Sequence, residues 1–184
     1  AGRSDTGGLA VCARQPWSLG GRWARAFDPE EPWFYMIAEL THETAPTINL
    51  LSVHLNPYRM QQGNAANRLA QADDIARAQV AQVSGLLNIV ATFQDPTVVA
   101  GDFNSPRDSA VHVDMRSKMT DTWEQGAWGP GQTVSLLDWL PMRVDYIYTT
   151  KEHFSVVNST IPDSTCSDHK PIVSTITLIG ESDL

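Results

Sequence analysis

The stretch Thr97-Val98-Val99-Ala100-Gly101-Asp102-Phe103-Asn104-Ser105-Pro106 decides how the chain is interpreted. Its apolar run, 97–100, is typical of a short buried strand, and Gly101 ends that run with a residue that tolerates unusual backbone angles. Asp102 and Asn104 follow, and two residues apart in extended backbone they lie on the same side. A strand that delivers a carboxylate and an amide to one point predicts a site at the carboxyl end of a sheet. An ordinary strand followed by an Asx turn fits the same residues, so the rest of the chain has to decide.

Hydrophobic periodicity predicts the elements around this strand. Alternating or continuous apolar runs predict further strands at 9–13, 33–40, 47–54, 143–148, 154–160 and 171–178. Turn residues predict a turn region at 15–25, a hairpin connection at 41–46, and loops at 121–131 and 161–167. The runs at 33–40 and 47–54 are expected to be adjacent antiparallel strands.

Two helices are predicted, a long one after Asn64 and a short one at 109–118. Asn64 is a suitable N-cap, and the long helix is expected to end near Phe93, before Asp95-Pro96. Apolar residues recur at three- and four-residue steps and predict its buried face: Leu69, Ala72, Ala76, Val80, Val83, Leu87 and Val90. Gln82 is expected to lie mostly off that face. Many strands with few helices predict an α/β or α+β layered sandwich.

Length and charge restrict the class of protein. A chain of 184 residues is long enough for one domain with a real core. It has no run of 18 apolar residues, so no membrane span is expected in this chain. The net charge of −8 argues against a broad, non-specific grip on nucleic acid, but not against a phosphate held through a metal ion.

The two cysteines, Cys12 and Cys166, do not make a metal cluster. Their number allows one disulfide or two thiols, and the compartment stays open. Because Cys12 falls in the apolar run 9–13, we expect it to be a buried thiol.

Polar groups that a buried strand does not need lie at or beside four predicted strands. His54 ends the first, Asp102 and Asn104 follow the second, Asp145 lies inside the run 143–148, and Asp168-His169 precede the last. Carboxylate oxygens such as those of Asp168 suit Mg²⁺ or Mn²⁺, which leave positions open for phosphate oxygens and water. Asp102 can orient or deprotonate a water that Asn104 positions, and a histidine held by an aspartate can stabilise negative charge on a phosphoryl group. The set predicts metal-assisted hydrolysis of a phosphate ester.

Four segments, in order, resemble the endonuclease/exonuclease/phosphatase superfamily, the group of deoxyribonuclease I. They are Ser52-Val53-His54-Leu55-Asn56-Pro57, Gly101-Asp102-Phe103-Asn104, Arg143-Val144-Asp145-Tyr146-Ile147-Tyr148 and Ser167-Asp168-His169-Lys170-Pro171-Ile172-Val173. The last is the most specific, and the resemblance covers roughly residues 8–178. It implies a four-layer sandwich, two β-sheets packed face to face with helices outside.

The resemblance also implies a role for each site residue. His54 resembles the histidine that contacts the scissile phosphate, and Asp102 and Asn104 resemble the pair that aligns and activates water and phosphate. Asp145 resembles the carboxylate that orients the last histidine. His169 resembles the histidine that faces the phosphoryl group, and its neighbour Asp168 resembles a metal ligand. The implied cofactor is Mg²⁺ or Mn²⁺, and the implied partner is a phosphate-ester substrate, nucleic acid among the candidates.

The chain departs from this family at its start. Family members begin with a strand that carries an Asn and a second strand that ends in Gln-Glu, whose Glu is a principal metal ligand. Neither is present, and residues 9–14 resemble the strand that follows them. Residues 1–184 are therefore expected to form a single domain of this type that is partial at the N-terminus.

Three functions fit these observations. The first is a nuclease-like phosphodiesterase, and the second is a phospholipid or inositol-phosphate hydrolase on the same scaffold. The third is an inactive fragment with an incomplete metal site and exposed apolar edges.

Outside the motifs, His42, His112 and His153 are expected at the surface. Trp123, Trp128 and Trp139 fit either a substrate-stacking wall or anchors of the core and loops.

Overall fold

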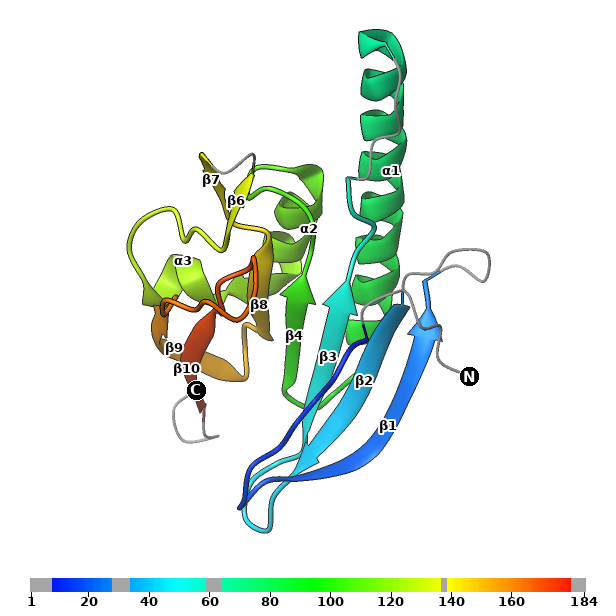
Figure 1. Ribbon diagram of the computed structural model, residues 1–184. Coiled ribbons are helices and arrows are strands. Elements are labelled where there is room, and N and C mark those ends of the chain that lie inside the picture. The colour runs from blue at the N-terminus through cyan, green and yellow to red at the C-terminus, as the bar shows by residue number, and fades with distance from the viewer. Residues whose placement is uncertain (1–7, 28–33, 59–63, 137–138, 180–184) are drawn as a thin grey trace.

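The computed structural model describes residues 8–27, 34–58, 64–136 and 139–179. In this part of the chain, a six-stranded mixed sheet has the order β1-β2-β3-β4-β8-β5 (Figure 1). Its strands are β1 (Ser18–Ala26), β2 (Phe34–Thr41), β3 (Ile48–His54), β4 (Thr97–Asp102), β5 (Met119–Asp121) and β8 (Asp145–Thr150). Only β3 and β4 are parallel neighbours within this sheet, and the 26-residue helix α1 (Ala65–Val90) connects them.

Two shorter helices and two small sheets complete the described fold. The helices are α2 (Ala110–Lys118) and α3 (Thr122–Gly126). The first small sheet pairs β9 (Phe154–Thr160) with β10 (Val173–Leu178), and the second pairs β6 (Val134–Leu136) with β7 (Leu140–Met142). None of the described helices is long and apolar enough to cross a membrane.

The central strand β4 separates two layers of apolar packing. Val99 faces a core that the sheet shares with α1 and α2, together with Leu51, Val83, Met115 and others. Val98 faces the other side, where Ile48 and Phe154 are buried and Ile176 and Leu178 of β10 pack against them. The sheet thus has α1 and α2 on one face and the β9–β10 sheet on the other, and α3 packs against β9. This confirms the predicted α/β class with helices outside the larger sheet.

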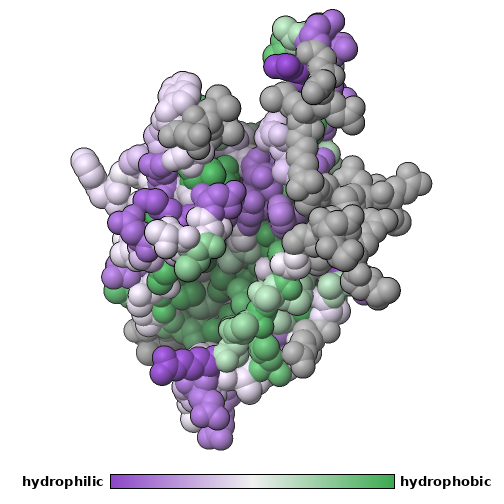
Figure 2. Space-filling model, in the orientation of Figure 1, coloured by the Kyte–Doolittle hydropathy of each residue, from purple (hydrophilic) through white to green (hydrophobic). Residues whose placement is uncertain are grey.

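The second layer leaves part of the larger sheet open. Figure 2 shows apolar side chains and a hollow on the face of the molecule turned toward the viewer. A cavity of about 340 Å³ there is lined by residues of β4 and β8, among them Ala100 and Ile147, and by Pro171 and Ile172. Leu50 and Ile147 remain only partly buried in the apolar cluster on this side.

Gly101 fits the sheet because it has no side chain. Its φ of +148° is one that L residues rarely adopt, and a Cβ built on it would lie 2.0 Å from the carbonyl oxygen of Val53. The glycine therefore allows β3 and β4 to approach closely just before both strands end at the site.

The long helix begins and ends where the sequence predicts. The Asn64 side chain accepts a hydrogen bond from the backbone N–H of Asn67, at 2.9 Å, and the helix is over before Asp95-Pro96. Its first turns project beyond the sheet (Figure 1), so Leu69 is 72% exposed although the periodicity places it on the buried face. Gln82, expected off that face, is buried together with Gln79.

The N-terminal elements differ from the prediction. Residues 9–13 form no strand, and Cys12 is exposed rather than buried. Instead β1 occupies most of the predicted turn region 15–25. It contains a β-bulge at the glycine pair between Leu19 and Arg22, and the Gly21 N–H donates to Glu39 Oε2 at 3.1 Å. The predicted turn is therefore wrong. Glycines inside a strand often mark a β-bulge, and here they interrupt the strand pairing without ending the strand.

The segment 121–131 was predicted as loop and is partly regular. Asp121 ends β5 and caps α3, because its carboxylate accepts a hydrogen bond from the Trp123 N–H at 3.0 Å. The short strands β6 and β7 have no counterpart in the prediction, while the helix predicted at 109–118 is confirmed as α2. Trp33, the first residue of the strand predicted at 33–40, lies outside the described residues.

Candidate active site

The parallel pair β3 and β4 brings the first two predicted site residues together. Both strands run toward the same edge of the sheet, where His54 is the register partner of Asp102. His54 Nε2 lies 3.7 Å from Asp102 Oδ2, and both side chains are partly buried. The carboxyl ends of adjacent strands therefore meet as the sequence predicts.

Asp145 reaches the same place from the other side of β4. It is the first residue of β8 and the antiparallel partner of Asp102. The His169 ring, carried by the segment before β10, donates from Nδ1 to Asp145 Oδ2 at 2.8 Å. Because Nδ1 carries the proton that bonds Asp145, the other ring nitrogen of His169, Nε2, takes no part in this hydrogen bond.

Three of the predicted residues form a compact group that can hold a cation. Ligand atoms of Asp102, Asp145 and His169 all lie within 4.8 Å of one another, and all three residues are partly buried. Two carboxylates at this spacing carry more negative charge than the single histidine balances. A divalent cation held by the carboxylate oxygens would relieve that excess.

The pKa values of the group follow from this crowding. Burial raises the pKa of Asp102, and the negative charge of Asp145 raises it further. The N–H of Asn104 and the two histidines, His169 and His54, act in the opposite direction without cancelling the rise. Burial alone would lower the pKa of His169, but the carboxylates around it, first Asp145 and then Asp102 and Asp168, outweigh burial, and the pKa is raised above its usual 6.5.

Asn104 fits both interpretations of the opening stretch. Its backbone N–H donates to Asp102 Oδ1 at 2.8 Å, which is the Asx turn, and its φ of +48° is left-handed. Its side chain also turns toward the neighbouring strand end, where Nδ2 donates to the carbonyl of Leu55 at 3.0 Å. The turn and the site are the same structure.

Two buried glutamines of α1 support the loops that carry these residues. Gln79 donates from Nε2 to the carbonyls of Asn56, at 2.7 Å, and Asn104, at 3.0 Å. Gln82 accepts from the Asn56 N–H at 3.0 Å. The sequence pattern indicates no role for either glutamine. The signal available was a pair of amides, three residues apart, beside the apolar positions of the helix.

Asp168, predicted as a metal ligand, does not belong to the three-residue group. It is exposed, and its Oδ1 accepts a hydrogen bond from Ser167 at 3.3 Å. Its charge adds to the rise in the pKa of His169. Its role as a ligand stays a prediction.

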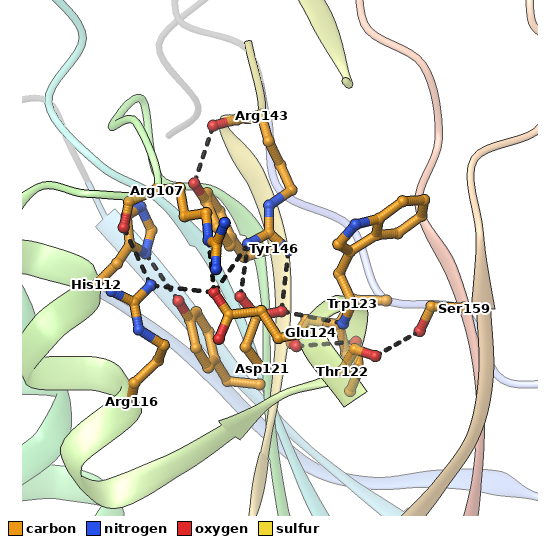
Figure 3. A network of polar contacts seen from close by, with 12 residues as sticks. Arg107, His112, Arg116, Asp121, Thr122, Trp123, Glu124, Arg143, Tyr146 and Ser159 are labelled. Carbon is orange, nitrogen blue, oxygen red and sulfur yellow. Dashed lines mark hydrogen bonds and ion pairs between the residues drawn. The ribbon is translucent and has the colours of Figure 1, made fainter. Parts of the chain in front are cut away.

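A buried ion-pair network joins the segment just before β8 to α3 (Figure 3). Arg143 donates from Nη1 and Nη2 to the two carboxylate oxygens of Asp121, at 3.0 and 2.7 Å, and both side chains are almost wholly buried. Glu124 lies 3.8 Å from Arg143 Nη2 and accepts from Arg107 Nε at 2.8 Å. The pair fixes the start of β8 against α3, two residues before Asp145.

His112, expected at the surface, is fully buried in this region. It stacks on Tyr146, pairs through Nδ1 with the Tyr148 hydroxyl at 2.8 Å, and contacts the Ser105 carbonyl through Nε2 at 3.0 Å. Burial lowers its pKa to about 3, so the ring is neutral.

Of the three tryptophans considered for stacking, Trp128 is 98% and Trp139 is 72% exposed, while Trp123 donates to the Gly129 carbonyl at 2.9 Å.

A family profile described as "Endonuclease/Exonuclease/phosphatase family" matches residues 1–169. The chain belongs to this family. It is a family of hydrolases that act on phosphoesters, generally with a divalent metal ion. No curated protein sequence is significantly similar to the chain.

Solved structures share the fold at low sequence identity. The human nocturnin catalytic domain with bound sulfate has a TM-score of 0.62 and 17% identity, over 89% of this chain and 60% of that one. D. rerio TDP2 complexed with a single-strand DNA product has a TM-score of 0.63 and 17% identity, over 88% of this chain and 68% of that one. The Bacteroides thetaiotaomicron mannosyl-6-phosphatase Bt3783 has a TM-score of 0.67 and 13% identity, over 88% of this chain and 67% of that one. The chain spans about two thirds of the length of these structures.

Proposed function

We propose that this protein is a divalent-metal-dependent phosphodiesterase of the nuclease-like kind. The observation that carries the proposal is the group Asp102, Asp145 and His169, whose ligand atoms lie within 4.8 Å of one another at the carboxyl edge of the sheet. Similarity to TDP2, whose structure holds a DNA product, supports the nuclease-like form.

The residues divide the chemistry according to their contacts. Asp102, whose pKa is raised by burial, accepts a proton from the attacking water. Asn104, fixed by the turn, positions that water. His169 is oriented through Nδ1 by Asp145 and uses Nε2 toward the phosphoryl oxygen, where an imidazolium stabilises the growing negative charge. His54, at the end of β3, contacts the same phosphate.

A bound divalent cation would supply Lewis acidity and neutralise charge on the phosphoryl oxygens. Asp168 is the ligand that we propose for it, and the Asp102–Asp145–His169 group is the alternative position. Asp168→Asn and Asp102→Asn separate the two. The variant that removes a ligand weakens Mg²⁺ or Mn²⁺ affinity in calorimetry, whereas the other retains the wild-type affinity.

The activity test is hydrolysis of bis-p-nitrophenyl phosphate and of plasmid DNA with Mg²⁺ or Mn²⁺. Asp102→Asn and His169→Ala are each expected to lower kcat by about 10²-fold or more. Matched controls are Asp163→Asn, an exposed partner of Lys170, and His42→Ala, whose contacts among the described residues are with Thr44 in its own turn and with the Trp17 ring. Equal rates for wild type and both site variants would refute the assignment.

A hydrolase of phospholipid or inositol phosphate is the second candidate. The net charge of −8 favours it, because a long polyanion is repelled by an acidic surface. Similarity to a mannosyl-6-phosphatase likewise supports small phosphate esters as substrates of this scaffold. A panel of DNA, sphingomyelin and inositol phosphates decides, and lipid or inositol-phosphate hydrolysis without DNA cleavage would overturn the nuclease-like form.

A further inference from the structure

We infer that Thr133 is a positioning residue for the Asp145–His169 pair, an inference that deepens the proposed function and rests on it for its catalytic meaning. Thr133 lies just before β6, 12 residues before Asp145, and is fully buried. It belongs to none of the four motif segments. Its hydrogen bonds reach the two chain segments that carry the pair.

The hydroxyl of Thr133 holds the start of β8. Its Oγ1 accepts hydrogen bonds from the backbone N–H groups of Val144, at 3.1 Å, and Asp145, at 3.3 Å. Among the described strands, none pairs with β8 here on its β5 side, since the β5 pairing covers only Tyr148 to Thr150. The hydroxyl therefore takes the place of a neighbouring strand for two amides that are directly at the site.

The backbone of Thr133 holds the segment that carries His169. Its carbonyl accepts from the Lys170 N–H at 2.7 Å, and its own N–H donates to the Met142 carbonyl at 2.9 Å. One buried residue thus touches Asp145 through its side chain and the neighbour of His169 through its main chain. The 2.8 Å bond between His169 Nδ1 and Asp145 Oδ2 depends on the separation of these two segments.

The arrangement gives the hydroxyl a specific task. Without an acceptor at Oγ1, the buried N–H of Val144 and the partly buried N–H of Asp145 lose their partner, and the backbone of Asp145 is expected to shift. A displacement of about 1 Å is enough to cost catalysis about 10²-fold when it moves an oriented group. The carbonyl contact to Lys170 stays in any variant of residue 133, so the side-chain task can be tested separately.

Three substitutions of Thr133 and one control variant test the hydroxyl. Thr133→Val keeps the shape and removes the acceptor, and Thr133→Ser keeps the acceptor and removes the methyl group. Thr149→Val is the matched control, because Thr149 is also fully buried in β8 and its Oγ1 has no hydrogen-bond partner among the described residues. Thr133→Ala is a second variant without the hydroxyl, for use if Thr133→Val does not fold.

The first readout is independent of activity. In metal-free protein at pH 9, ¹⁵N shifts of the His169 ring, assigned with His169→Gln, report which nitrogen carries the proton. Wild type, Thr133→Ser and Thr149→Val are expected to hold it on Nδ1, and Thr133→Val to move toward the Nε2–H form of unpaired imidazole. An unchanged ring in Thr133→Val, or the same change in Thr133→Ser, overturns the inference. Fast amide exchange at both Val144 and Asp145 in the wild type overturns it without any variant.

The second readout is phosphodiester hydrolysis. Thr133→Val is expected to lower kcat by about tenfold or more with KM within about twofold, and Thr133→Ser to restore most of kcat. If kcat falls equally in Thr133→Ser, the hydroxyl is not the cause and the inference fails. If the wild type hydrolyses no phosphodiester, the proposed function fails, and the ring spectra alone decide the role of Thr133.

Discussion

At the scale of single residues, Gly101 is the point where the site tolerates no side chain. A Cβ there would meet the Val53 carbonyl at 2.0 Å in a backbone conformation of φ +148°. Gly101→Ala is therefore expected to destabilise the fold by about 3 kcal/mol, the sum of backbone strain and overpacking. Gly85→Ala is the control, because nothing lies within 4 Å of a Cβ at that helical position. It should stabilise by about 0.5 kcal/mol. Urea unfolding of the two variants measures the difference, and equal stability would contradict the close approach.

His169 gives a pH dependence at the same scale. Asp145 raises its folded pKa above 6.5, so its stabilisation is present below pH 6.5 and is lost as the pH rises through the folded pKa. In Asp145→Asn burial remains without the nearby charge, and the pKa should fall below the wild-type value. Imidazole NMR titration without metal measures the pKa of His169 in the wild type and in Asp145→Asn. His112, with a pKa of about 3, is the internal control and should not titrate between pH 5 and 9.

The stability consequence can be checked separately. As the pH rises from 6 through the folded pKa of His169, the free energy of unfolding should fall more in the wild type than in Asp145→Asn. The same slope in both proteins would mean that the pair does not set the protonation of His169.

At the scale of elements, α1 both fills the core and supports the site. Gln79 is buried and donates to two carbonyls of the loops after β3 and β4. Gln79→Met keeps the length and removes the donor, and should cost about 1–2 kcal/mol of stability because two partly buried acceptors lose their partner. Asn88→Met, at an exposed position of the same helix, should be nearly neutral. Thermal unfolding compares the two, and a neutral Gln79→Met would show that the loops hold themselves.

Most of the elements could be predicted from the sequence, because period and caps are local signals. Asn64 begins α1, and the run 97–100 is β4. The edge strand β1 was missed because its glycine pair resembles a turn, whereas in the structure β2 supplies its partner. Leu69 was misplaced because periodicity identifies a face of a helix and not how far the sheet beneath it extends.

The site divides in the same way. His54, Asp102, Asn104, Asp145 and His169 lie at or near strand ends within recognisable segments, so the sequence could single them out as candidates. Thr133, Gln79 and the Arg143–Asp121 pair act through contacts between distant segments. Threonine and glutamine are common at any position, so only the folded arrangement distinguishes these residues.

At the scale of the whole molecule, the larger sheet is unequally covered. Helices bury one face, but the β9–β10 sheet leaves Leu50 and Ile147 partly exposed on the other, next to a cavity of about 340 Å³ (Figure 2). The native protein is therefore expected to bind the apolar dye ANS without denaturant. Ile147→Gln should reduce the fluorescence, and Trp128→Ser, at an isolated exposed aromatic residue, should not. Fluorescence equal to buffer would show that this face is covered in solution.

The two cysteines, finally, suit the protein to site-specific labelling. Both are free and exposed, and they lie at opposite ends of the described chain. Cys166 stands three positions before His169, so a fluorophore or spin label attached there would report on the segment that carries the histidine. A label on Cys12 would report instead on the segment before β1. Each single-cysteine variant thus provides a reporter without introducing a thiol into the protein.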